Sequence, residues 1–267
     1  MGVTTIAIHG AAGRMGRRLI ALASETPERF KMVAALDRAG APEIGMDAGR
    51  MAGVAELGVP VTSELGSAKP EVMIDFSIPA AMRAILARCA QNKISLLIGT
   101  TGITADDHKL IDAAAGSIAI LQATNTSLGI NLLLQVVADV AKKLGPDYDI
   151  ELVESHHNQK KDAPSGTAIS LLESICAATG KNPATDITHG REGPDCKRQP
   201  GTIGVHSLRM GDVIGEHHVT FATSGERIEI GHRATTRDTF ARGAIRAAAW
   251  LVPQKPGRYS MKDVLGL

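Results

Sequence analysis

Histidine, lysine and hydroxyl side chains are concentrated in one short stretch of the sequence, ESHHNQKKDAPSGTA, at residues 154–168. A histidine can donate a proton near neutral pH, and a lysine can donate a proton or bind a carboxylate through its charge. His156 and Lys160 are therefore the candidate proton donors of an active site. We expect a loop here between a strand over 149–154 and a helix over 165–179, because a loop on a rigid frame can hold such groups toward a cleft.

The end of this stretch has the composition of a helix start. Ser165, Gly166 and Thr167 would present backbone N–H groups that have no partner within the helix, and the positive end of the helix dipole favours an anion there. Pro164 stiffens the entry to the helix, and Asp162 is placed to orient a neighbouring group. The pattern therefore predicts an anionic substrate close to the two proton donors.

Two other interpretations of the histidines are open. His156 and His157 could form a metal pair, but no nearby cysteine or second histidine pair completes a site, so we predict no metal. The stretch could also be a solvated charged loop, although its basic groups directly precede a tightly structured helix start. His217 and His218 lie on an expected strand, and we interpret them as structural.

A glycine-rich turn near the N-terminus, GAAGRMG at 10–16, predicts a dinucleotide site between a strand over Thr4–His9 and a helix over Arg14–Ser24. The common fingerprint is GxGxxG, and here the middle glycine is displaced by one. Small residues let the backbone approach a pyrophosphate, which then meets the N-terminus of the helix. Asp37 ends the next expected strand, where a carboxylate can bind ribose hydroxyls, and Arg38 could meet a 2′-phosphate. An ordinary glycine turn is the alternative.

The remaining elements give the chain two different halves. In the first half, short apolar strands alternate with helices, which is typical of an α/β, Rossmann-type doubly wound parallel sheet. Polar turns at 99–101 and 123–126 follow two of these strands and are placed to line a nicotinamide pocket, and His9 is expected to be buried at a strand end. Residues 39–60 and 181–200 are predicted to be loops, the first of them long and mobile. In the second half, strands joined by glycine turns predict an α+β domain with a mixed or antiparallel sheet; they are expected over 202–209, 216–222 and 227–234.

Composition narrows the functional class. The 267 residues suit one large or two modest domains, and 44% hydrophobic but only 3% aromatic residues predict an aliphatic core. A net charge of +1 and few aromatic side chains argue against a nucleic-acid partner. The three cysteines form no CxxC pair, and neither a signal peptide nor a run of 18 apolar residues is found. We therefore expect a soluble cytoplasmic protein without a membrane partner.

Taken together, these motifs resemble the dihydrodipicolinate reductase family of the lysine and diaminopimelate pathway. The resemblance implies an enzyme that reduces a cyclic, dicarboxylated imine precursor with NADH or NADPH. It also implies a homotetramer whose second domain builds the subunit interface. The segments that carry the resemblance span nearly the whole chain in order: GAAGRMG (10–16), DFS (75–77), IGTTG (98–102), ATNTSLGIN (123–131), residues 154–168, PGTIGVHSLRMGDVIGEH (200–217) and DVLGL at the C-terminus.

The resemblance also implies roles for individual residues. His156 matches the family's proton donor and acceptor, Lys160 matches its proton-donating lysine, and His157 matches a substrate contact. Gly166 and Thr167, after Ser165, match the turn that holds the substrate carboxylate. Some members have glutamate where Asp37 stands and an aromatic residue where Thr126 stands. The expected cofactor contacts are Gly10, Ala11, Ala12, Gly13, Arg14, Met15, Asp37, Arg38, Gly99, Thr100, Thr101, Ala123, Thr124, Asn125 and Thr126.

The expected domains are a discontinuous dinucleotide-binding domain over 1–127 and 240–267 and a substrate-binding and oligomerisation domain over 128–239. Two rival functions share the glycine turn. One is another nicotinamide-dependent enzyme, an amino-acid or semialdehyde dehydrogenase, which would not need the residues of 154–168 in this arrangement. The other is a non-catalytic protein that senses NADH or NADPH and leaves those residues chemically idle.

Overall fold

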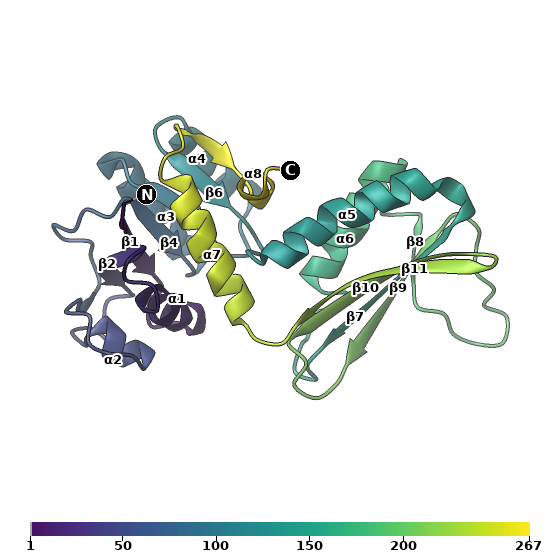
Figure 1. The fold of residues 1–267 in the computed structure, drawn as a ribbon, viewed down its shortest axis with the longest axis horizontal. Coiled ribbons are helices and arrows are strands. Elements are labelled where there is room, and N and C mark those ends of the chain that lie inside the picture. The colour runs from purple at the N-terminus through teal and green to yellow at the C-terminus, as the bar shows by residue number, and fades with distance from the viewer. Residues whose placement is uncertain (1) are drawn as a thin grey trace. The chain divides into compact units, whose positions relative to one another are not determined.

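The computed structural model describes residues 2–267, which divide into two compact units (Figure 1). The first unit contains the chain up to Leu128 together with Asp238–Leu267, and the second unit is the continuous segment Gly129–Arg237. Each unit has its own sheet and its own hydrophobic core. Every helix within residues 2–267 is too short or too polar to cross a lipid bilayer.

The first unit is built on a parallel sheet of seven strands in the order β12-β6-β5-β4-β1-β2-β3. The chain leaves β1 to one side for β2 and later returns to the other side for β4, so the strand order reverses at β1. Ligands bind at the carboxyl ends of strands beside such a reversal. The elements are β1 (Thr4–His9), α1 (Arg14–Ser24), β2 (Phe30–Leu36), α2 (Ala48–Ala52), β3 (Val61–Thr62), β4 (Val72–Asp75), α3 (Pro79–Asn92), β5 (Ser95–Ile98), α4 (Ala105–Ala115), β6 (Ala119–Gln122), α7 (Asp238–Leu251), β12 (Gly257–Tyr259) and α8 (Met261–Leu265).

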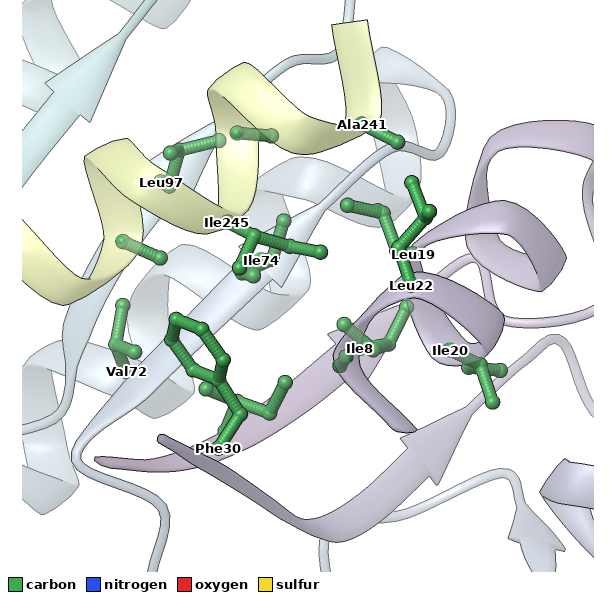
Figure 2. Packing of buried hydrophobic residues seen from close by; sticks show 14 of the residues in the cluster. Ile8, Leu19, Ile20, Leu22, Phe30, Val72, Ile74, Leu97, Ala241 and Ile245 are labelled. Atoms are coloured by element: carbon green, nitrogen blue, oxygen red, sulfur yellow. The ribbon is translucent and has the colours of Figure 1, made fainter. Parts of the chain in front are cut away.

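Helices cover both faces of this sheet. On one face, α1 and α7 pack against the strands through side chains such as Leu19 and Ile245, which meet Ile8 and Ile74 (Figure 2). On the other face, α3 and α4 bury Met82 and their other apolar residues. The strands are buried on both sides, which explains their continuous apolar sequences. The α/β prediction for this half of the chain is confirmed.

The second unit is a mixed sheet of five strands, in the order β11-β10-β7-β9-β8, with α5 and α6 on one face. Ile150, Leu152, Val219 and Phe221 alternate along their strands toward the helices and fill the core. β10 is antiparallel to β7 and β11, whereas β9 is parallel to β7 and β8. The elements are α5 (Leu128–Leu144), the short 3-10 helix η1 (Gly145–Asp147), β7 (Asp149–His156), α6 (Gly166–Thr179), β8 (Ile187–His189), β9 (Ile203–Arg209), β10 (Gly215–Thr223) and β11 (Glu226–Ala234).

The predicted loop over residues 39–60 is where sequence and structure differ most. It contains α2, and the carboxylate of Asp47 accepts hydrogen bonds from the backbone N–H groups of Gly49, Arg50, Leu57 and Val59. This half-buried carboxylate therefore organises the segment, and the prediction of a long loop missed the helix, whereas the mobility of the segment stays a prediction. β3, β8 and β12 were also missed, because strands of two or three residues show no periodicity.

Candidate active site

The glycine turn after β1 leaves no room for side chains at two of its three glycines. Gly10 has a φ of +78°, and a Cβ atom there would lie 2.3 Å from the carbonyl oxygen of Phe76. A Cβ on Gly16 would lie 2.2 Å from the carbonyl oxygen of Gly10. Gly13 is the N-cap of α1 and lacks a side chain that could occupy the first-turn N–H groups. The two glycines thus allow the tight turn and the close packing of α1 that are typical of a dinucleotide-binding turn.

Asp37 joins this turn to the end of β2. Its carboxylate accepts hydrogen bonds from the backbone N–H groups of Ala12 and Arg38, each at 2.8 Å. The N–H groups of Gly10 and Ala11 both donate to the carbonyl oxygen of the residue before Asp37, at 2.9 Å. A carboxylate has about four lone-pair sites, so Asp37 keeps acceptor capacity for the hydroxyls of a ribose. This is the placement that the sequence predicted.

A cleft of about 520 Å³ opens at the carboxyl ends of the parallel strands in the first unit. Most of the predicted cofactor contacts line it, whereas Gly10, Ala11, Ala12, Asp37 and Arg38 do not. Three residues that were not predicted as contacts line it as well, two of them from the DFS motif. The lining consists of Gly13, Arg14, Met15, Phe76, Ser77, Gly99, Thr100, Thr101, Ala123, Thr124, Asn125, Thr126 and Phe240.

The fully buried carboxylate of Asp75 binds residues that line this cleft. His9 Nδ1, Ser77 Oγ and Thr100 Oγ1 each lie 2.6 Å from an oxygen of Asp75. Thr100 Oγ1 also accepts from the backbone N–H of Ser77 at 2.8 Å. The network joins the ends of β1, β4 and β5. Sequence reasoning placed His9 at a strand end but missed Asp75, whose signal was a single acid at the end of an apolar run.

The second unit carries another buried carboxylate, beneath the predicted proton donors. Glu154 is fully buried, and its Oε2 lies 2.5 Å from Nδ1 of His156. Arg209 donates to both oxygens of Glu154, at 3.0 and 2.8 Å, and the N–H of Ser165 donates at 3.1 Å. Burial raises the pKa of Glu154, but the hydrogen bonds from Arg209, His156 and Ser207 outweigh burial and lower the pKa to about 2. Glu154 is therefore ionised at neutral pH.

Lys160 lies close to this cluster. Its Nζ is 2.8 Å from both carboxylate oxygens of Asp162, while the side chain is 20% exposed. Asp162 thus orients a neighbouring group, the role for which the sequence made it a candidate. Its carbonyl oxygen accepts a hydrogen bond from Nη2 of Arg209 at 2.7 Å. His157 supplies a carbonyl oxygen to the N–H of Lys160, at 3.1 Å, and its ring is half-buried.

α6 begins where the sequence predicts a helix start. Ser165 is the N-cap, and its Oγ accepts from the N–H of Ala168 at 3.2 Å. A Cβ on Gly166 would meet no atom within 4 Å, so the first turn is open on that side. Thr167 follows in the same turn. The arrangement leaves space for a carboxylate at the positive end of the helix.

His217, which the sequence analysis interprets as structural, is buried beside His156 and Ser165, whereas His218 is exposed. Nε2 of His217 lies 3.1 Å from Ser165 Oγ, and its ring meets the ring of His156 edge-on, with centroids 5.3 Å apart. Burial lowers the pKa of His217 to about 3, so this ring is neutral at physiological pH. Among residues 2–267, no three His, Cys, Asp or Glu side chains are grouped to hold a metal ion.

The parallel sheet with its glycine turn defines a Rossmann-type oxidoreductase, and comparisons with known proteins identify the family. Residues 4–126 match the model "Dihydrodipicolinate reductase, N-terminus", and residues 129–265 match "Dihydrodipicolinate reductase, C-terminus". The chain belongs to the dihydrodipicolinate reductase family. As the resemblance implied, it is an oxidoreductase of lysine and diaminopimelate biosynthesis that reduces 4-hydroxy-tetrahydrodipicolinate, a small dicarboxylate, with a nicotinamide cofactor.

Individual relatives cover the whole chain. The 4-hydroxy-tetrahydrodipicolinate reductase of Alkalilimnicola ehrlichii is 46% identical over 266 residues, which are 99% of each chain. The reductase of Geotalea uraniireducens is 47% identical over 264 residues, covering 98% of each. Among solved structures, dipicolinate-bound dihydrodipicolinate reductase from Paenisporosarcina sp. TG-14 superposes with a TM-score of 0.77 at 23% identity, over 97% of both chains. This last likeness supports the fold.

Proposed function

We propose that His156 and Lys160 are the groups that exchange protons with the substrate, and that Ser165, Gly166 and Thr167 bind its carboxylate with help from His157. The observation that carries the proposal is the gathering of these groups in the second unit, around the buried Glu154. The positive charge of Lys160 lowers the pKa of His156. An anion-binding helix start beside two proton donors suits an anionic substrate that must gain a proton.

The reaction then divides among these groups. The substrate loses its hydroxyl group as water, and bound nicotinamide supplies a hydride to a ring carbon conjugated to the imine. His156 or Lys160 gives a proton to the enamine-like anion that results. In balance, 4-hydroxy-tetrahydrodipicolinate, the reduced dinucleotide and one proton yield tetrahydrodipicolinate, the oxidised dinucleotide and water. The helix start at Ser165 holds the carboxylate in place throughout, while the positive charge of Lys160 favours the developing anion.

Each unit has one part in this proposal. The first unit, with the cleft and the glycine turn, binds the dinucleotide, and the second unit binds the substrate and builds a homotetramer. The expected boundaries over 1–127, 128–239 and 240–267 go with these roles. The solved relative of the same fold that is described as dipicolinate-bound supports a planar dicarboxylate as ligand. A cytoplasmic location remains a prediction from the sequence.

Turnover with the proposed substrate is the first test. Freshly prepared cyclic imine and NADH or NADPH should give a rapid loss of reduced-nicotinamide absorbance, whereas other carbonyl and imine compounds should give none. Oxidation of an amino acid or a semialdehyde with NAD+ or NADP+ instead would favour the rival dehydrogenase. A crystal soaked with dipicolinate and dinucleotide tests the site itself, because the proposal requires Lys160 to face the ring of the bound dipicolinate. A Lys160 directed to bulk solvent in that crystal would refute it.

Asp37 and Arg38 should determine which dinucleotide is preferred. Asp37 offers acceptors to the hydroxyls of NADH, and Arg38 offers a positive charge to the 2′-phosphate of NADPH, so we expect the wild type to use both. Asp37→Ala should raise Kd for NADH about 10-fold, the value of one charge-assisted hydrogen bond, and raise Kd for NADPH less. Arg38→Ala should do the reverse. Titration of both dinucleotides against both variants measures this, and equal effects on NADH and NADPH would contradict it.

A further inference from the structure

Glu154, which is fully buried, and Arg209, whose side chain is 20% exposed, form an ion pair in the second unit. Arg209 comes from β9 and Glu154 from β7, the two strands that pair in parallel at the centre of the sheet. Glu154 contacts the ring of His156, and Arg209 donates a hydrogen bond to a backbone oxygen in the loop that carries Lys160. Two donors that sit on different elements are thus connected through one arginine.

The contacts of Glu154 determine which nitrogen of His156 can act. An ionised carboxylate can only accept hydrogen bonds, so Nδ1 of His156, 2.5 Å away, must carry a hydrogen. This leaves Nε2 as the nitrogen that can exchange a proton, and among residues 2–267 it has no hydrogen-bond partner. Gly215 lies beside Nε2, where a Cβ would come within 3.1 Å, so the glycine keeps this edge of the ring uncrowded.

Arg209 has two functions in this arrangement. Its guanidinium binds both oxygens of Glu154, the geometry that Arg and carboxylate groups favour, and so keeps a fully buried charge compensated. Its Nη2 also donates to the carbonyl oxygen of Asp162, whose carboxylate holds Nζ of Lys160. Movement of Arg209 would therefore disturb His156 through Glu154 and Lys160 through Asp162.

We infer that Glu154 and Arg209 are positioning residues, which hold His156 with Nε2 toward the substrate and keep the Lys160 loop in place beside it. This inference rests on the proposed roles of His156 and Lys160. A carboxylate behind a histidine fixes both the orientation of the ring and its tautomer. Neither Glu154 nor Arg209 needs to touch the substrate for this role.

The charged groups around His156 make its pKa a measure of the positioning role. The ring contacts Glu154 from β7 and the neutral His217 from β10, and the charges of Lys160 from the following loop and Arg209 from β9 act on its pKa. Burial lowers the pKa of His156, the hydrogen bond with Glu154 raises it, and the charges of Lys160 and Arg209 lower it, so that the pKa lies below its ordinary value. Removing Glu154 or Arg209 should therefore move this pKa in opposite directions.

The test is the pH profile of kcat for Glu154→Gln and Arg209→Met, with Arg209→Lys as a milder variant in case the methionine does not fold. Loss of the negative charge in Glu154→Gln should shift the limb that reports His156 to lower pH by about one unit. Loss of the positive charge in Arg209→Met should shift it to higher pH. We expect kcat to fall about 10- to 100-fold in each, as when the partner of a metal-bound histidine is removed, with KM for the dinucleotide unchanged.

A matched control is available on the same strand. Glu151 also comes from β7 and is bound at both oxygens by Arg191, but this pair makes no contact with His156. Arg191→Lys should leave kcat and its pH profile as in the wild type. Nitrogen NMR of His156 should show a hydrogen on Nδ1 in the wild type and a mixture of tautomers in Glu154→Gln.

The outcomes distinguish failure of the positioning role from failure of the proposed function. Shifts of the same direction in both variants, or an unchanged profile with an unchanged His156 tautomer, would overturn the positioning role. A His156→Ala variant with wild-type kcat would instead refute the proposed function, whatever the Glu154 variants do. Opposite shifts of the pH profile, together with a large fall of kcat in His156→Ala, would support the positioning role and the proposed function.

Discussion

Replacing Lys160 or His156 with alanine should lower kcat about 10²- to 10⁴-fold, the contribution of one positioned proton donor. The fold of Lys160→Ala should survive, because its partner Asp162 is 61% exposed and ion pairs with an exposed partner contribute little to stability. Binding of NADH should be unchanged, since the predicted dinucleotide contacts all lie in the first unit. Stopped-flow or steady-state reduction of the cyclic imine, together with NADH titration, measures both effects.

The neighbouring Lys161 provides the control for this experiment. It carries the same charge one residue further along the chain and is exposed. Lys161→Ala should keep wild-type kcat. If the Lys160 and His156 variants both turned over as fast as Lys161→Ala, these two side chains would not be the proton donors.

A methyl group at Gly16 should have the second large effect, this time on the first unit. A Cβ there would lie 2.2 Å from the carbonyl oxygen of Gly10 and 2.6 Å from that of Ala11, and both are rigid backbone atoms. Gly16→Ala must therefore separate α1 from the glycine turn. We expect the free energy of unfolding to fall by about 1–3 kcal/mol, as for overpacked cores, and NADH affinity to fall with it because the turn moves.

Gly116 provides the control for Gly16, because an added Cβ atom there would make only an ordinary van der Waals contact. Gly116, the C-cap of α4, has a φ of −65°, and the nearest atom to an added Cβ is 3.4 Å away. Gly116→Ala should fold and bind NADH like the wild type. Unfolding in denaturant can be followed by the fluorescence of the single tryptophan, Trp250, on α7 in the same unit. Equal stability of the two variants would show that close contact at Gly16 is not required.

Local sequence patterns predicted much of this architecture. Apolar runs of four to eight residues predicted the longer strands, and the sequence over 165–179 predicted α6. The same reasoning brought His156, Lys160 and Ser165 together, because a short loop between a strand and a helix leaves them little freedom. The parallel pairing of β9 with β7 was different, since nothing in the local pattern of β9 specifies its partner strand.

The site residues that sequence reasoning missed are those brought together by long-range strand pairing. Arg209 is 55 residues from Glu154 in the chain, and only the pairing of β7 with β9 brings the two together. Asp75 and His9 are 66 residues apart and meet only because β4 lies beside β1. Long-range strand pairing therefore had to be known before either buried carboxylate could be assigned its neighbours.

The division of the first unit between the two ends of the chain has a consequence for synthesis. β12 is an edge strand of the seven-stranded sheet, and α7 supplies Ala241 and Ile245 to the same core as β1 and α1. These last segments leave the ribosome only after Gly129–Arg237 has emerged in full. The continuous second unit can therefore assemble on the nascent chain, whereas the core of the first unit stays incomplete until α7 and β12 have emerged.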